Sequence, residues 1–257
     1  MEAKSHQQKI QTQFDPQAEA YLHSRVHSSG PDLLRAQEII QELPGHAEKQ
    51  LLDVGCGAGH LSFALAPWVK HVTATDPLPG MLDTVKKAAA DRALRNVNTS
   101  MAVAERLPFK TAQFDIVATR YSAHHWENLP AALIEMRRVL KPGGLILIID
   151  LQGDENPLVD THLQTMELLR DPSHLRDRSP SEWARLLAAA GFAGIAHESW
   201  PTRLEFQPWV TRMRTPPKQV EVIRILQCEA PEEVQSALKF EEDGSFTATT
   251  GLWWGRG

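Results

Sequence analysis

Short apolar runs alternate with longer stretches of helical periodicity between residues 50 and 150. Three stretches, at residues 60–69, 79–94 and 129–140, carry apolar side chains at the spacing of one helix face. Near-continuous apolar strands separated by helices are typical of a parallel sheet covered on both faces, so this region predicts a doubly wound α/β fold. The strands expected here are LLDVG (51–55), HVTATD (71–76), VNTSMAV (97–103), FDIVATR (114–120) and LILIID (145–150).

The chain beyond residue 150 continues the pattern with two helices. Residues 155–170 predict one of them. The stretch SPSEWARLLAAAGF predicts the other, with Ser179 as its N-cap and Glu182 completing a capping box. Gly191 follows the expected end of this helix, where a residue in the left-handed conformation commonly stops it.

Two further strands are expected at residues 193–206 and 245–255, which makes a mostly parallel sheet of seven strands. The segment 206–242 between them carries apolar residues at helical spacing. This segment predicts two or three helices that form a cap inserted before the last strand.

The N-terminal residues, 1–45, predict lid helices that precede the sheet. From Phe14 to Leu22, apolar residues that include Tyr21 share one side of a short amphipathic helix, and Pro31 begins another helix. A plain packed aromatic is an equally good interpretation of Tyr21. The predicted organisation is one domain, 1–257, made of the lid (1–45), the core (46–205 and 243–257) and the cap (206–242).

Composition narrows the classes of protein. A chain of 257 residues that is 42% hydrophobic can bury a full core. The net charge of −5 offers no basic field for nucleic acid or an anionic membrane. The two cysteines, Cys56 and Cys228, are too few for a disulfide scaffold or a zinc site, and no apolar run is long enough to span a bilayer. We expect a cytoplasmic protein without a metal.

The sequence DVGCGAGH places three glycines, Gly55, Gly57 and Gly59, directly after the first strand. Such a turn lets backbone N–H groups face a ligand at the start of a helix. The dinucleotide-binding fingerprint needs its third glycine one position later, where this chain has His60. The spacing therefore argues against a nicotinamide oxidoreductase.

Two acidic residues flank this turn. Asp53 precedes the glycines and suits an ammonium group, whereas it would repel a pyrophosphate. Asp76 closes the second strand, where a carboxylate can accept hydrogen bonds from both ribose hydroxyls. An amino acid joined to a nucleoside without phosphates satisfies both positions. The alternatives are that Asp53 complements a helix dipole and that Asp76 forms a turn before Pro77.

These features resemble the class I S-adenosylmethionine-dependent methyltransferases. DVGCGAGHLS matches the first motif of that family and TDPLPGML the second. AERLPFKTAQFDIV, RYSAHHW and RRVLKPGGLILIID are similar to later motifs of the methyltransferase type 11 branch, which includes the ubiquinone and menaquinone C-methyltransferases. The tail, with LRDPSHLRDRSPSEW and WVTRMRTP, resembles a bacterial subgroup of that branch. The resemblance implies S-adenosylmethionine as cofactor, S-adenosylhomocysteine as product, and a Rossmann-like sheet.

The resemblance also implies which residues bind the cofactor. In this family the first motif holds the methionine amino end, the second motif holds the ribose, and the residues after the third strand line the adenine. One departure is Val103, which stands where the branch commonly has an Asp or Asn for the adenine amine. The cofactor-binding residues implied are Asp53, Gly55, Gly57, Gly59, Asp76, Met81, Ala104, Glu105, Arg120 and Tyr21.

The segment RYSAHHWEN follows the fourth strand, at the sheet edge where open α/β proteins bind ligands. A proton must leave an oxygen, nitrogen or carbon acceptor during methylation, so a base near the methyl group would help. His125, His124 and Tyr121 are the candidates. Adjacent side chains point in different directions, so at most one of the two histidines should face the site and the other should cap or pack.

The acceptor pocket is expected farther along the chain. The candidates are a histidine, two arginines and two tryptophans from the tail and the cap, although solvated arginines are the commoner case. The substrate-binding residues predicted are His174, Arg176, Trp183, Trp209 and Arg212.

The sequence therefore predicts methyl transfer to a small molecule at carbon, nitrogen or oxygen. One alternative is a non-catalytic protein that binds the cofactor. A nucleic-acid methyltransferase is a further alternative, although such enzymes usually carry Asn or Asp, Pro-Pro and an aromatic residue where this chain has RYSA. The identity of the acceptor and the oligomeric state stay open.

Overall fold

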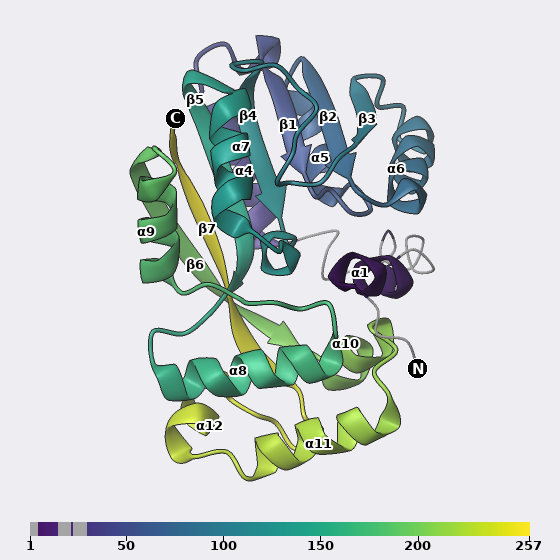
Figure 1. Ribbon diagram of the computed structural model, residues 1–257, viewed down its shortest axis with the longest axis vertical. Helices are drawn as coiled ribbons and strands as arrows, with labels where there is room; N and C mark the ends of the chain where they lie inside the picture. The colour runs from purple at the N-terminus through teal and green to yellow at the C-terminus, as the bar shows by residue number, and fades with distance from the viewer. Residues whose placement is uncertain (1–4, 15–21, 23–29) are drawn as a thin grey trace.

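The computed structural model describes residues 5–14, 22 and 30–257 (Figure 1). Its sheet has seven strands in the order β3-β2-β1-β4-β5-β7-β6. The first five strands pair in parallel, and β7 runs antiparallel to both of its neighbours. The predicted seven-stranded, mostly parallel sheet is confirmed. The strands are β1 (Gln50–Val54), β2 (His71–Asp76), β3 (Val97–Met101), β4 (Phe114–Arg120), β5 (Leu140–Gln152), β6 (Ala193–Leu204) and β7 (Phe246–Arg256).

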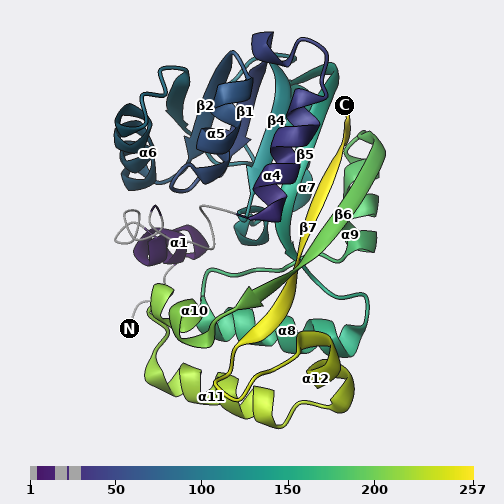
Figure 2. The same cartoon turned by 180° about the vertical axis from the view of Figure 1, so that it is seen from behind.

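Helices cover both faces of this sheet because its central strands are apolar on both sides. Leu51 and Leu52, neighbours in β1, are both fully buried, one against each of two separate apolar clusters. Seen from the two sides, α7 and α9 cover one face and α4 and α5 cover the other, with α6 beside β3 (Figures 1 and 2). These helices are α4 (Pro31–Gln41), α5 (His60–Leu65), α6 (Pro79–Asp91), α7 (Leu129–Val139) and α9 (Pro180–Ala189).

The start of α9 follows its sequence signal. The Ser179 side chain accepts from the Glu182 backbone N–H, and the Glu182 carboxylate accepts from the Ser179 backbone N–H. This reciprocal pair satisfies two backbone donors that would otherwise be unpaired at the helix start. The predicted capping box is therefore present.

Strands β6 and β7 extend beyond the parallel strands and carry a second layer of helices (Figure 1). Trp209 and Phe246 lie in an apolar cluster there with Val159, so the helix that follows β5 packs with those between β6 and β7. No helix among the described residues is long and apolar enough to cross a bilayer. The second layer consists of α8 (Pro157–Arg170), α10 (Phe206–Arg212), α11 (Pro217–Cys228) and α12 (Glu232–Leu238).

The described N-terminal helix, α1 (His6–Phe14), lies between the sheet and the second layer (Figures 1 and 2). Helix α1 ends at Phe14, where the helix predicted from the sequence begins. Residues 15–21 of that predicted helix lie outside the described residues. Tyr21, the residue predicted to approach the cofactor, lies outside the described residues.

Candidate active site

A cavity of about 720 Å³ opens where β1 and β4 end, next to the point at which the strand order reverses. Open α/β sheets bind ligands at this position because the loops diverge there. The glycine turn after β1 and the end of β2 form one side of the cavity. Ile10 and Phe14 of α1, a helix that the sequence analysis did not anticipate, form the other side.

All three glycines of the turn have backbone angles that favour glycine, and two of them also lack room for a side chain. Gly55, Gly57 and Gly59 have φ angles of +68°, +50° and +90°, which L side chains rarely adopt. A Cβ on Gly55 would lie 2.0 Å from the Ser122 hydroxyl, whereas a Cβ on Gly57 would meet nothing within 4 Å. A Cβ on Gly59 would lie 2.7 Å from the Phe63 ring, so this glycine permits close helix packing and is not a lining residue.

Asp53 is fully buried at the end of β1 and lines this cavity. Its Oδ2 accepts a hydrogen bond of 2.7 Å from the Ser62 hydroxyl. Its Oδ1 is buried and has no hydrogen-bond partner among the described residues. Burial raises the pKa of Asp53 to about 7, although the bonds from Ser62 act in the other direction. The orphaned oxygen fits a ligand that brings a cationic donor.

Asp76 is held at the end of β2 by two backbone groups. Its Oδ2 accepts from the Gly57 N–H at 3.0 Å, and its Oδ1 accepts from the Leu78 N–H at 2.9 Å. These two hydrogen bonds link the glycine turn to the residue before α6, and Asp76 also lines the cavity. Met81, in the first turn of α6, packs with Leu78 against Ile10 of α1 and lines the same cavity.

Three further predicted cofactor residues, Ala104, Glu105 and Arg120, also line the large cavity. Ala104 and Glu105 line it beside Val103, and the Glu105 carboxylate accepts from the Asn128 N–H at 3.2 Å. Arg120 closes β4 and also lines the cavity. Its guanidinium pairs with buried Asp32 at the start of α4, so a cationic group is fixed on the same wall as Asp53.

A second cavity of about 80 Å³ lies on the other side of the 3₁₀ turn η4 (Ala123–His125). It shares Phe14, Tyr121 and His125 with the large cavity, so these three residues stand between the two spaces. Three of the predicted substrate residues, His174, Trp209 and Arg212, are brought together here, and His124 lines only this cavity.

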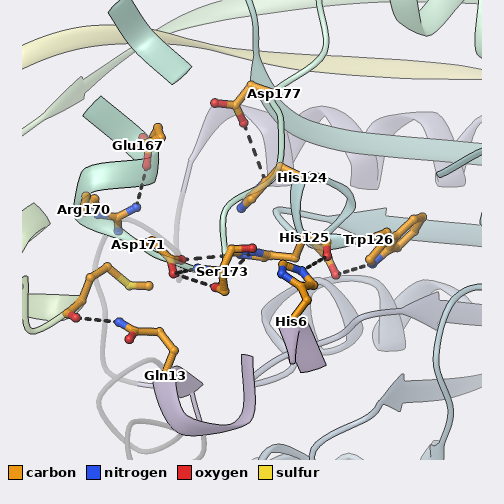
Figure 3. A network of polar contacts seen from close by, with 12 residues as sticks. His6, Gln13, His124, His125, Trp126, Glu167, Arg170, Asp171, Ser173 and Asp177 are labelled. Carbon is orange, nitrogen blue, oxygen red and sulfur yellow. Dashed lines mark hydrogen bonds and ion pairs between the residues drawn. The ribbon is translucent and has the colours of Figure 1, made fainter. Parts of the chain in front are cut away.

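His124 is tied to a carboxylate of β5. Its Nδ1–H donates to Asp150 Oδ1 at 2.6 Å, and its backbone N–H donates to Asp150 Oδ2 at 3.2 Å. Burial alone would lower the pKa of His124, but Asp150 and Asp177 outweigh that effect and raise it to about 9. Figure 3 shows His124 beneath Asp177, whose nearer oxygen lies 3.9 Å from Nδ1.

The surroundings of His125 shift its pKa in the direction opposite to that of His124. The His125 Nδ1–H donates to the Ser173 carbonyl at 3.1 Å (Figure 3). Its ring meets that of Phe14 edge to face, with 5.2 Å between the ring centroids. His6 of α1 donates from Nε2 to the His125 carbonyl at 3.0 Å. Burial, followed by the positive charge of His124, lowers the pKa of His125 to about 4. It is therefore neutral at neutral pH, and the near-neutral pKa expected for a free imidazole does not apply.

Tyr121 and His174 are both neutral near pH 7 because burial shifts their pKa values. Burial raises the pKa of Tyr121 to about 12, so its phenol does not serve as a base near neutral pH. Tyr121 has a φ of +49°, rare for a residue with a side chain, and its hydroxyl lies 2.9 Å from that of Thr250. Burial lowers the pKa of His174 to about 2, and its Nε2 hydrogen-bonds Gln164 at 2.9 Å.

Two predicted substrate residues are not brought to either cavity. Trp183 is 1% exposed and packs against Trp253 of β7, because the apolar side of α9 faces the sheet. Arg176 pairs with Asp160 at 3.0 Å and Glu182 at 3.1 Å outside both cavities. The sequence analysis predicted both residues in the acceptor pocket, and neither of them lines the large or the second cavity.

The structure adds residues that the sequence analysis did not select. Asp150 ends an apolar run at the close of β5, the same signal that identified Asp76 at the close of β2. Phe14 was noted only as an apolar position. Arg170 and Asp171 line the second cavity, but no local pattern in the sequence distinguishes them from surface charges.

Comparison with known proteins places the chain in a family. Residues 52–148 match the methyltransferase domain family. The chain is 43% identical over 196 residues to the uncharacterized protein YafE of Escherichia coli K12, covering 76% of this chain and 94% of that protein. It is 31% identical over 157 residues to a demethylmenaquinone methyltransferase of Chlorobaculum parvum, covering 58% of this chain and 63% of that protein.

The uncharacterized methyltransferase YcgJ of Bacillus subtilis supports the same placement. It is 34% identical over 206 residues, which cover 80% of each chain. Its crystal structure superimposes with a TM-score of 0.82 at 30% identity, covering 88% of this chain and 97% of that one. The chain belongs to the S-adenosylmethionine-dependent methyltransferases and has the class I fold of that family.

Proposed function

We propose that this enzyme binds S-adenosylmethionine in the large cavity and methylates a small-molecule acceptor held in the second cavity. The observation that carries this proposal is the shared wall. Phe14, Tyr121 and His125 line both spaces, so the two cavities adjoin at these residues, and methyl transfer from cofactor to acceptor would take place beside them.

The large cavity fits the charges of the cofactor. The buried, unpartnered Oδ1 of Asp53 would accept from the methionine ammonium, and Arg120 on the same wall would attract the carboxylate. Asp76 would accept from the ribose hydroxyls, since each carboxylate oxygen has lone pairs beyond the one used by the backbone. Met81 and Ala104 would contact the adenine with apolar atoms.

The cofactor supplies a methyl group that its sulfonium has already activated. The protein therefore has to position the acceptor and exclude water. Helix α1 does the latter, since it covers the large cavity and is tied to both layers of the molecule. His6 contacts η4, and the Gln13 amide donates to the Met213 carbonyl after α10 at 2.6 Å.

His125 is the residue best placed to take a proton from the acceptor. Its Nδ1 carries a proton toward Ser173, so its Nε2 keeps a lone pair, and the ring borders both cavities. A neutral oxygen or nitrogen becomes strongly acidic as it gains a methyl group, so even a weak base suffices at that stage. His124, a donor held by Asp150, would orient the acceptor from the other side.

A small molecule is favoured over a nucleic acid. The second cavity is small and partly enclosed by α8 and α10, and the chain carries a net charge of −5. A nucleic acid needs an open, basic groove. The match to a demethylmenaquinone methyltransferase, which is named for a small-molecule acceptor, favours the same class of acceptor.

The test is transfer of an isotopically labelled methyl group from S-adenosylmethionine into a bacterial metabolite extract, followed by mass spectrometry. We expect label in a small molecule with the parent protein and much less label with Asp76→Ala at a subsaturating concentration of S-adenosylmethionine. Binding of S-adenosylhomocysteine without any labelled product would favour a non-catalytic binding protein. Label found only in RNA or DNA would overturn the small-molecule proposal.

A further inference from the structure

Three metal-ligating side chains converge beside the second cavity from segments far apart in the sequence. They are His124 in η4, Asp150 in β5 and Asp177 between α8 and α9. One ligand atom of each, the histidine Nδ1 and two carboxylate oxygens, lies within 4.8 Å of the others. Asp150 and Asp177 are each 1% exposed. This is a buried cluster, unlike the acidic surface groups that occur commonly without an ion.

Asp177 is the member of the cluster that accepts no hydrogen bond. Both of its carboxylate oxygens are buried, and neither accepts a hydrogen bond from any described residue. Its nearer oxygen lies 3.9 Å from His124 Nδ1, but that imidazole already donates to Asp150. One imidazolium charge does not balance two buried carboxylates, so a further cation or a proton must compensate the cluster.

The backbone holds Asp177 in this position. Its N–H donates to Gln164 Oε1 at 3.1 Å, and its carbonyl accepts from Gln164 Nε2 at 2.8 Å. A Cβ on Gly153 would lie 2.6 Å from the same carbonyl, which shows how closely β5 and this segment approach. The backbone of Asp177 is therefore fixed beside the end of β5, with its side chain buried.

Asp150 and His124 are held just as firmly. Asp150 accepts from the His124 ring, from the His124 backbone N–H and from the Leu151 N–H at 2.9 Å. The three ligands are thus fixed before any ion arrives, and fixed ligands lower the entropic cost of binding. Sequence spacing could not reveal them, because His124 and Asp150 are 26 residues apart and lie in η4 and β5.

We propose that His124, Asp150 and Asp177 bind one divalent transition-metal cation, of the Mn²⁺ or Zn²⁺ class. One imidazole nitrogen and two carboxylate oxygens form a mixed donor set that these ions accept, whereas Mg²⁺ prefers oxygen ligands alone. A divalent charge would balance the two carboxylates when the imidazole is neutral. His124 also lines the second cavity, which provides a path for the ion. The proposal does not depend on the proposed function.

The ion would fix the His124 ring beside the acceptor. It would replace the proton that now joins His124 to Asp150. The requirement for a deprotonated histidine makes binding tighter as the pH rises. The chemistry of methyl transfer stays with the residues at the shared wall, so the ion is a positioning element.

The test is metal binding by the full chain after treatment with a chelator. MnCl₂ is titrated and free Mn²⁺ is followed by electron paramagnetic resonance, while bound Zn²⁺ is counted by mass spectrometry after dialysis. We expect one equivalent of either ion, a rise in Tm with added ion, and no displacement by excess MgCl₂. Asp177→Asn should weaken binding at least tenfold, the size of effect seen when a metal site is disturbed.

Asp171→Asn is the matched control. Asp171 is 2% exposed and lines the second cavity, but it accepts from Ser173 and lies outside the cluster. The control removes the same charge and should keep the affinity of the parent. Equal Mn²⁺ affinity in the Asp177→Asn variant would overturn the proposal. An unchanged Tm with Mn²⁺ or Zn²⁺, together with a higher Tm for Asp177→Asn, would assign a proton to Asp177 and would also overturn it.

A second measurement covers the case in which Asp177→Asn does not fold. Crystals of the parent protein grown with MnCl₂ are examined for anomalous scattering. A peak bounded by the three side chains supports the site, and a map without one rejects it. S-adenosylhomocysteine binding is measured on the same preparation, so failure of the metal site is distinguished from failure of the proposed function.

Discussion

The large cavity has polar groups that lie at the ends of neighbouring strands, whereas the second cavity collects side chains from six separate parts of the chain. Asp53 and Asp76 lie at the ends of β1 and β2, and the Gly57 N–H between them donates to Asp76. His125, Arg170 and Trp209 come from η4, α8 and α10, and they meet only because the second layer of helices packs there.

This difference separates recognition of the cofactor from recognition of the acceptor. A turn held by backbone groups keeps its shape when surrounding side chains change, so it suits a ligand common to a whole family. A cavity built from side chains of the second layer changes with every substitution there. The same sheet can therefore hold one cofactor while the acceptor differs between relatives.

The largest effect is expected where the two cavities meet. His125→Ala should lower kcat by about 100-fold or more, because the acceptor proton loses its base. S-adenosylhomocysteine affinity should stay within about threefold, since cofactor binding rests on the strand ends. Steady-state kinetics and calorimetry measure the two quantities. A raised KM with kcat nearly intact would assign His125 to positioning the acceptor.

Removal of the Asp76 carboxylate, which we propose binds the ribose, should give the next largest effect. Asp76→Ala should weaken S-adenosylhomocysteine binding by about 1.5–3 kcal/mol, the range for hydrogen bonds to a charged group. The exposed Asp83 of α6, which pairs only with Lys86 at the surface, provides the control Asp83→Ala. Calorimetry compares both variants with the parent, and circular dichroism checks that they fold. An unchanged dissociation constant for Asp76→Ala would remove this residue from the site.

The two regions also differ in how far the sequence predicts them. Asp53 and Asp76 follow apolar runs whose strand identity is clear, so their meeting at one sheet edge can be inferred without the structure. The capping box of α9 was found for the same reason, since its signal lies within four residues. Local patterns of this kind carry their own geometry.

The second cavity offers no such pattern. Trp183 and Arg176 are near His174 in sequence, yet the sheet buries the first, and the carboxylates of Asp160 and Glu182 pair with the second. The raised pKa of His124 depends on Asp150, which the packing of η4 on β5 brings near. The lowered pKa of His125 depends on its burial and on the charge of His124. These features follow from tertiary contacts, which residue spacing does not encode.

The pH dependence of cofactor binding tests the cofactor side alone. The carboxyl of Asp53 has a pKa raised to about 7 by burial, so its charged form decreases as the pH falls below 7. An ammonium group binds the charged form, and S-adenosylhomocysteine affinity should therefore fall, approaching tenfold per pH unit, between pH 7 and 5.5. Asp53→Asn should bind weakly at every pH in this range and show no such slope. A parent affinity that is flat across the range would place the ammonium elsewhere.

The smallest effect tests the boundary of the acceptor cavity. Arg176 is two residues from His174, but its guanidinium is 37% exposed and pairs with Asp160 and Glu182. Arg176→Ala should leave KM for the acceptor and the dissociation constant of S-adenosylhomocysteine within about twofold of the parent. The free energy of unfolding should fall by no more than about 1 kcal/mol, because partly exposed ion pairs contribute little. Steady-state kinetics and urea unfolding measure these values. A several-fold rise in KM would mean that the acceptor extends beyond the second cavity to the start of α9, and Arg176 would then belong to the acceptor site.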